Sequence, residues 1–161
     1  SCGIGIANKE IAMGSKTLFT AMLACLAFLF SLPAHAENAQ DFGDHVVHFN
    51  ALTTDNLPPT VTREYGITRS KNRALLNVAI LRKVLGTTNQ PVAAKISATV
   101  TNLTGQQREI ELREIREGSA IYYIGEFGVN HEENLDFSIV AHPEDHDRPL
   151  RVQFQQRFFT R

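Results

Sequence analysis

The sequence predicts an all-β domain, an immunoglobulin-like antiparallel β-sandwich of about seven strands, preceded by a signal-peptide helix. Apolar and polar residues alternate through several segments of residues 37–161, which is typical of half-buried strands. Clusters of turn-forming residues separate these segments at the short intervals of antiparallel sheets. No repeating strand–helix unit appears, and this absence argues against a parallel α/β fold.

The leader is the first part of the chain to interpret. Lys16 is followed by an uncharged apolar run, 18–32, and then by Ala34-His35-Ala36. The run is shorter than the roughly 20 residues that span a bilayer. The pattern predicts a signal peptide over 13–36, cleaved between Ala36 and Glu37, with an uncleaved anchor as the alternative. Residues 1–12 precede Met13 and are interpreted as a mis-called upstream extension.

After cleavage at this site, we expect residues 37–161 to form a single periplasmic domain that does not insert into the membrane. The chain has 16 Lys and Arg against 17 Asp and Glu, so neither a nucleic-acid footprint nor a polybasic membrane patch is expected. Cys2 and Cys25 both precede the cleavage site. The exported domain therefore has no disulfide, thiol nucleophile or cysteine metal site, and we expect no cofactor.

The segment 70–83 is an apolar run bounded by charge, and it predicts the central strand at about 73–84. Its apolar residues occupy both alternating faces, and one face is interrupted by Asn77. A strand with two apolar faces belongs in the middle of a packed structure, although a buried helix is the alternative. A buried amide must be hydrogen-bonded, so Asn77 is expected to pin a loop or the first strand.

The segments before this strand predict one strand and one helical turn. Residues 41–55 form a first strand whose apolar residues do not keep one phase, which indicates a bulge or a change of partner. Residues 60–65 form the only helix expected in the mature chain. Pro59 occupies its first position and Gly66 its left-handed stop.

The segments after the central strand predict a run of hairpins. Residues 108–117 are interpreted as a strand with a break near 113–114, and a charged helix is the alternative. Apolar and polar residues alternate clearly in the remaining expected strands, which are 92–101, 120–127, 135–141 and 150–159. The expected strands are separated by turns or polar loops over 86–91, 102–106, 117–119, 130–134 and 142–149.

A polar loop near the C-terminus holds the best candidate metal ligands, His142, Glu144, Asp145 and His146. Imidazole and carboxylate groups can surround a divalent ion, although a solvated acidic loop is the simpler interpretation. His45 and His48 are three positions apart on an expected strand, so they point to opposite faces.

A basic segment is the second candidate site, with Arg63, Arg69, Lys71 and Arg73. It is interpreted as a site for an anion or an acidic partner, or as the solvated approach to the central strand.

Catalytic machinery is not evident. Ser119 lacks the G-x-S-x-G elbow of hydrolases, and the paired acids lie in loops without a shared cleft. We therefore expect that the protein is not an enzyme.

Four segments of the mature chain match a known family: HFNAL (48–52), YGITRSKNRALLNVAI (65–80), REIREGSAIYYIGEF (113–127) and VQFQQRF (152–158). Through them the chain resembles the DUF4426 family of small exported bacterial proteins. The resemblance implies a periplasmic domain and is compatible with the sandwich. It supplies no activity and no catalytic residues.

The sequence thus predicts a periplasmic, non-enzymatic binding or accessory domain that contacts an envelope protein through strand edges or loops. A binding module for a small ligand or a metal ion is the alternative. A hydrolase with an unrecognised site is the third hypothesis.

Overall fold

The structure is a computed structural model that describes residues 38–160. The expected signal peptide, its cleavage site and residues 1–12 lie outside the described residues. No helix within residues 38–160 is long and apolar enough to cross a membrane.

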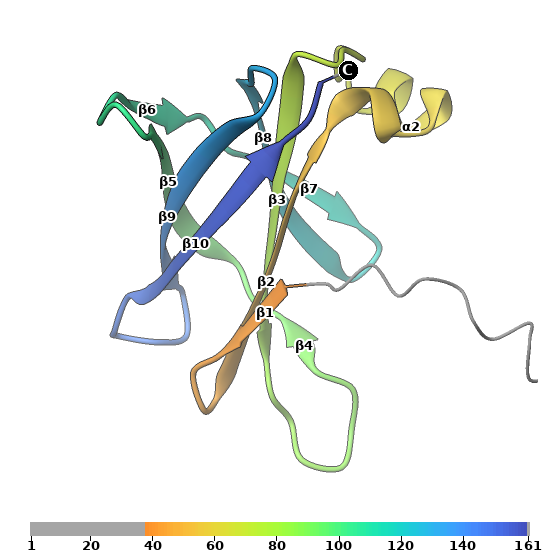
Figure 1. Cartoon of the computed structure of the whole chain (residues 1–161). Helices are drawn as coiled ribbons and strands as arrows, with labels where there is room; N and C mark the ends of the chain where they lie inside the picture. The colour runs from red at the N-terminus through yellow and green to blue at the C-terminus, as the bar shows by residue number, and fades with distance from the viewer. Residues whose placement is uncertain (1–37, 161) are drawn as a thin grey trace, which may run out of the picture. The chain divides into compact units, whose positions relative to one another are not determined.

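Strands make up most of the described chain (Figure 1). The helical elements are the 3₁₀ turn η1 (Thr54–Asn56) and the helix α2 (Pro59–Glu64). The strands are β1 (Asn38–Asp41), β2 (His45–Thr53), β3 (Arg73–Arg82), β4 (Gln90–Pro91), β5 (Ala94–Asn102), β6 (Gln107–Ile110), β7 (Arg113–Glu117), β8 (Ala120–Gly128), β9 (Glu133–Pro143) and β10 (Leu150–Phe158).

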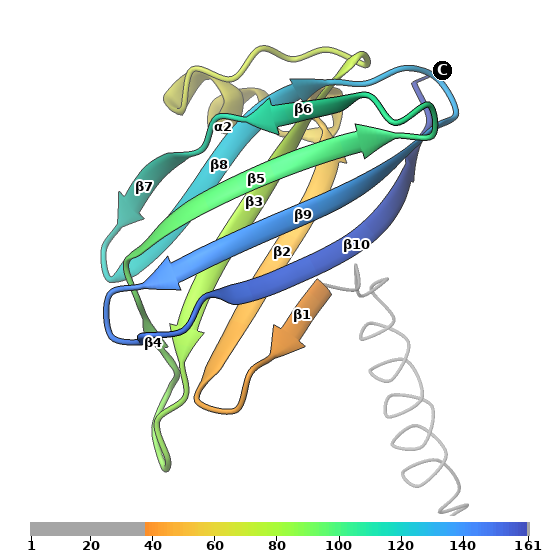
Figure 2. The same ribbon diagram turned by 90° about the vertical axis from the view of Figure 1, so that its left-hand side faces the viewer.

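The strands form two antiparallel sheets that face one another, which confirms the predicted β-sandwich. The larger sheet has the order β1-β2-β3-β8-β7, and β4 pairs with the end of β3. The smaller sheet has the order β10-β9-β5-β6. Figure 2 shows the smaller sheet in front, with the long strands of the larger sheet behind it. The central strand is confirmed as β3, which lies between β2 and β8.

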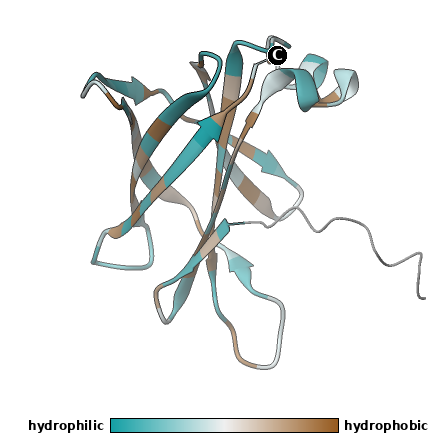
Figure 3. Cartoon of the chain, in the orientation of Figure 1, coloured by the Kyte–Doolittle hydropathy of each residue, from teal (hydrophilic) through white to brown (hydrophobic). Residues whose placement is uncertain are grey.

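Alternation along the strands builds the core between the sheets, and it is visible as brown and teal bands in Figure 3. Phenylalanines from both sheets meet there. The rings of Phe137 and Phe154 stack with centroids 4.5 Å apart, and the Phe49 ring lies 4.6 Å from that of Phe154. Such aromatic contacts add stability beyond the buried area itself.

Several details of the larger sheet differ from the prediction. β2 keeps one phase, with His45, Val47 and Phe49 all buried on the inner face, so the expected bulge is wrong. β1 was not predicted, because its sequence NAQD is short and polar. It pairs with β2 as a hairpin at the edge of the sheet.

The predicted break in residues 108–117 is confirmed but lies earlier, at Glu111 and Leu112. It exists because β6 pairs in the smaller sheet and β7 in the larger one, so the chain crosses between the sheets at this point. The predicted helical turn is also confirmed. It is α2, followed by Gly66 with φ of +63°.

Candidate functional site

The outer face of the larger sheet carries a second, smaller hydrophobic cluster. Its buried members are Ile67, Leu75 and Ile124, each less than one-tenth exposed. Because β3 is apolar on both faces, one face enters the core of the sandwich and the other needs a separate cover. The segment around α2 supplies that cover on the side of β3 away from the smaller sheet (Figure 1).

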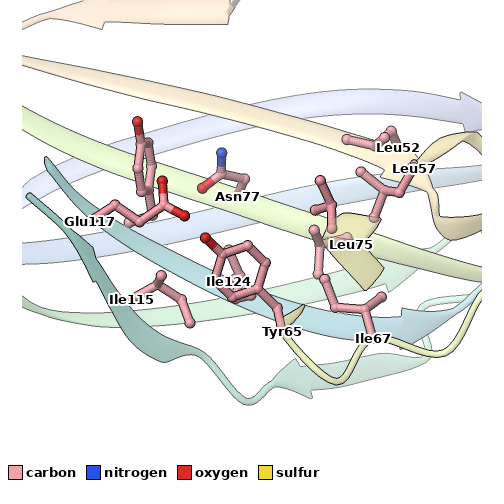
Figure 4. Close-up of a pocket in the computed structure, with 11 residues that line it drawn as sticks. Leu52, Leu57, Tyr65, Ile67, Leu75, Asn77, Ile115, Glu117 and Ile124 are labelled. Atoms are coloured by element: carbon pink, nitrogen blue, oxygen red, sulfur yellow. The ribbon is translucent and has the colours of Figure 1, made fainter. Parts of the chain in front are cut away.

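The cover is incomplete and leaves a cavity of about 200 Å³, which we call the α2 groove (Figure 4). Its walls come from α2 and the residues that flank it, and from β2, β3, β7 and β8. Most lining side chains are aliphatic: Leu52, Leu57, Val61, Ile67, Leu75, Ile115 and Ile124. Tyr65, Asn77, Glu117 and Tyr122 complete the lining.

Hydrogen bonds close the segment 54–70 on itself and hold it over the sheet. The fully buried Thr54 hydroxyl donates to the carbonyl of Thr68 at 2.7 Å and accepts from the amide of Ser70 at 2.9 Å. The guanidinium of Arg113 on β7 donates to the carbonyl of Tyr65. The two ends of the cover are therefore tied to one another, and its middle is held to β7.

The groove is polar at one end. Figure 4 shows the side chains of Asn77 and Glu117 at the end away from Ile67 and Leu57. The Oδ1 atom of Asn77 is buried and accepts no hydrogen bond from the described residues. Asn77 was expected to pin a loop or the first strand through a hydrogen bond of its amide, and the amide oxygen makes no such bond with the described residues.

A second depression, of about 220 Å³, lies further along the same face of β3. Ala79 and Leu81 line this depression. Every second residue of β3 points to the outer face, so these two lie on the same face as Leu75 and Asn77 of the α2 groove. Tyr122 lines both the depression and the α2 groove. The outer face thus presents two apolar hollows in succession.

The predicted basic residues border the α2 segment, and three of them are engaged within the protein. Arg63 donates to the carbonyl of Pro59, and Arg69 donates to the carbonyl of Asp55. Arg73 pairs with Glu126 at 3.3 Å. Lys71 lies exposed in the turn before β3. An anion site at these residues stays a prediction.

The predicted metal ligands are not brought together. His142 lies exposed on β9 opposite Lys95, whereas Glu144, Asp145 and His146 follow the strand. The described residues contain no group of three or more His, Cys, Asp or Glu side chains placed to hold a metal ion.

Asp145 instead joins a contact that the sequence did not indicate. The Nε2 atom of the buried His45 lies 2.9 Å from Asp145 Oδ1, and Arg82 lies 3.3 Å from Oδ2. The His146 ring centroid lies 5.1 Å from that of His45.

His45 and His48 do point to opposite faces of β2, as predicted, because His45 pairs with Arg82 and His48 with Ala79.

Glu114 lies on the face of β7 opposite to Glu117, and its carboxylate is paired within the protein. Hydrogen bonds from Arg116 and then from the Tyr123 hydroxyl lower the pKa of Glu114. Burial, and to a smaller extent the nearby carboxylate of Glu114, raise the pKa of Tyr123. This network faces away from the α2 groove, because Glu114 and Glu117 point to opposite sides of the strand.

Comparisons with known proteins agree with this architecture. A family model described as a domain of unknown function (DUF4426) matches residues 39–161, which confirms the resemblance noted in the sequence. A crystal structure of a DUF4426 family protein from Pseudomonas aeruginosa PAO1 is 30% identical, with a TM-score of 0.67. That match covers 78% of this chain and 97% of the other.

More distant structures have the same fold. FetP from uropathogenic E. coli strain F11 is 14% identical with a TM-score of 0.55, and the match covers 77% of this chain and 94% of FetP. A copper-bound variant of FetP is 15% identical with a TM-score of 0.53, covering 76% of this chain and 95% of the variant. No curated protein matches the sequence.

Proposed function

The chain belongs to the DUF4426 family, and on that premise we propose that it is a periplasmic, non-enzymatic domain that binds an envelope protein through the α2 groove. The groove carries this proposal because it is an apolar hollow on a sheet face that the rest of the fold leaves partly uncovered. Export is supported by the signal-peptide pattern over 13–36.

The size of the groove favours a side chain of a partner protein over a whole small molecule. Its volume of about 200 Å³ is below the roughly 300–1,000 Å³ typical of small-molecule pockets. Protein interfaces, in contrast, commonly concentrate their binding energy in one or two aliphatic or aromatic anchors seated in such hollows. The second depression, next to the groove along β3, provides a place for a second anchor.

The lining residues also support binding rather than catalysis. They include Glu117, Tyr65 and Tyr122, but no Ser, Cys, His or Lys that would form a nucleophile–base pair. A general base needs a reacting group within hydrogen-bond reach, and an aliphatic wall supplies none.

Copper, which the FetP variant binds, does not fit the residues of this chain. Copper sites use Met, Cys or His ligands. Residues 38–160 contain neither Met nor Cys, and their His, Asp and Glu side chains include no group of three or more that could hold a metal ion. The His45–Asp145 contact is the nearest approach to a ligand set, but each carboxylate oxygen of Asp145 already has a partner. The positive charge of Arg82 beside that carboxylate also opposes a second cation.

Site-specific photo-crosslinking in cells tests the proposal. The photoreactive residue p-benzoyl-phenylalanine is placed at Ile115, which lines the groove, and separately at Leu103, an exposed apolar residue in the β5–β6 turn. We expect one envelope protein to be linked from Ile115 and not from Leu103. The same products from both positions, or none from Ile115, would contradict binding at the groove.

The location has its own test. The protein recovered from the periplasm should have the mass of a chain that begins at Glu37. A mass that includes the leader, or recovery in the membrane fraction, would contradict the proposed processing.

A further inference from the structure

The two ends of the α2 groove differ in chemistry, and this difference constrains what can occupy it. Leu57 and Ile67, from the segment around α2, form an aliphatic end of the groove, whereas Asn77 and Glu117 form a polar end (Figure 4). Both polar side chains offer oxygen atoms. A carboxylate accepts hydrogen bonds and donates none, and an amide oxygen also only accepts.

The side-chain oxygen of Asn77 has no hydrogen-bond donor among residues 38–160. Oδ1 is buried, and none of the described residues donates a hydrogen bond to it. A buried acceptor without a partner is costly and uncommon, so it requires an explanation. The terminal torsion of an Asn side chain is soft, so a small rotation of the amide can present Oδ1 to a donor in the groove.

The carboxylate of Glu117, an exposed residue at the end of β7, has no ion pair or side-chain hydrogen bond with the described residues, whereas other acids of this sheet have partners. Glu114 pairs with Arg116, and Glu126 pairs with Arg73. Arg113, which shares the outer face of β7 with Glu117, is instead directed to the carbonyl of Tyr65. The polar end therefore holds a negative charge and an unsatisfied acceptor, and no Lys or Arg among the described residues pairs with either.

We infer that the partner places a Lys or Arg side chain at the Asn77–Glu117 end of the groove, next to an aliphatic side chain at the Leu57–Ile67 end. This inference rests on the proposed function, and it adds the chemical class of the partner's binding segment. A cationic donor satisfies both acceptors at once, and charge-assisted hydrogen bonds are the stronger ones. The methylene stem of such a side chain can also lie against the aliphatic wall.

Blocked dipeptide amides provide the probes. Leucyl-lysine, leucyl-norleucine and leucyl-glutamate share the aliphatic residue and differ only in the second side chain. Each is titrated into the purified ¹⁵N-labelled protein, and binding is followed through the backbone amide signals of Asn77, Ile115 and Glu117. We expect leucyl-lysine to bind about fivefold to tenfold more tightly than leucyl-norleucine, and leucyl-glutamate more weakly than both.

Two variants test whether Glu117 causes the preference for the lysine dipeptide. Glu117→Gln should reduce the lysine preference to less than about twofold, because the carboxylate is removed while the groove keeps its shape. Glu109→Gln is the matched control, since Glu109 is exposed on β6 in the other sheet. It should leave the preference unchanged, and an equal loss in both variants would overturn the assignment.

The outcomes separate this inference from the proposed function. Equal binding of leucyl-lysine and leucyl-norleucine would overturn the cationic anchor but leave an apolar protein-binding groove. If none of the dipeptides shifts the groove signals, the proposed function itself fails. Hexylammonium is a further probe, and its binding without any dipeptide binding would indicate a small amine in place of a protein partner.

Discussion

The hydroxyl of Tyr123 accepts a hydrogen bond from the backbone amide of Ala94, with 2.8 Å between oxygen and nitrogen. Tyr123 lies on β8 of the larger sheet, and Ala94 begins β5 of the smaller one. The same hydroxyl donates to Glu114 on β7 at 3.0 Å. A single phenol thus links the two sheets, and Tyr123 is almost fully buried.

Tyr123→Phe should lower the free energy of unfolding by about 1–2 kcal/mol, because it removes both hydrogen bonds and leaves the Ala94 amide without its acceptor. Urea unfolding followed by circular dichroism measures this change. Tyr122→Phe is the matched control, since the hydroxyl of Tyr122 makes no hydrogen bond with the described residues. Equal losses in the two variants would contradict a specific role for the Tyr123 hydroxyl.

Alkaline pH should destabilise the protein through the same residue. Burial raises the pKa of Tyr123 above its ordinary value of 10.0, so the folded state holds this proton more tightly than the unfolded state does. Stability is therefore complete below pH 10.0 and falls as the pH rises through the folded pKa. Wild-type protein should lose more stability than Tyr123→Phe over this range in urea unfolding, and parallel pH profiles would contradict the assignment.

Gly125→Ala should be strongly destabilising. A Cβ atom at this position would lie 2.5 Å from the carbonyl oxygen of Glu111 and 2.7 Å from Cγ2 of Ile110, where the chain crosses between the sheets. Overpacking of this kind costs about 1–3 kcal/mol. Gly128→Ala on the same strand meets nothing closer than 3.7 Å and should cost less. Similar thermal midpoints for the two variants would contradict the steric explanation.

The fold was largely predictable because strand alternation records which face of each strand is buried. β9 and β10 alternate throughout, and their predicted strands are confirmed. β1 could not be predicted, because a short polar edge strand has no buried face to leave an alternating pattern. The sequence wrongly predicted a bulge or a change of partner in β2, because apolar residues appear on both of its faces. Val46 and Leu52 are apolar although they point to the half-covered outer face.

The candidate site was not predicted, and its geometry explains why. The α2 groove draws side chains from segments as distant as Leu52 and Ile124, and none of these positions has a distinctive local pattern. Asn77 was the one informative signal, since a polar residue interrupts an otherwise apolar strand. The partner of Asp145 was equally hidden, because His45 lies 100 positions away in sequence.

Divalent metal ions should leave the thermal midpoint of the purified protein unchanged. His45 and Arg82 occupy the oxygens of Asp145, and the described residues offer no complete ligand set. A metal that binds only the folded state would raise the midpoint. Thermal shift assays with Cu²⁺, Zn²⁺ and Ca²⁺ measure this, with a chelator as the control. A rise that disappears in His142→Ala or His146→Ala would restore the metal site that the sequence suggested.

Asn77→Leu should stabilise the free protein while removing its preference for a cationic probe. The substitution replaces a buried, unsatisfied acceptor with an aliphatic side chain in an aliphatic wall. We expect the free energy of unfolding to rise by about 1 kcal/mol, measured by urea unfolding. Asn50→Leu is the matched control, because Asn50 pairs with Asn77 across the strands but is exposed.

A gain in stability at Asn77 and none at Asn50 would indicate that the fold retains a costly polar group for a reason other than its own stability. Functional sites often keep such locally unfavourable residues. If Asn77→Leu is instead less stable than the wild type, Asn77 contributes to the fold, and only Glu117 would then support a cation at this end of the groove. The dipeptide titration on the Asn77→Leu variant separates these results, since loss of lysine preference without loss of stability assigns the amide to binding.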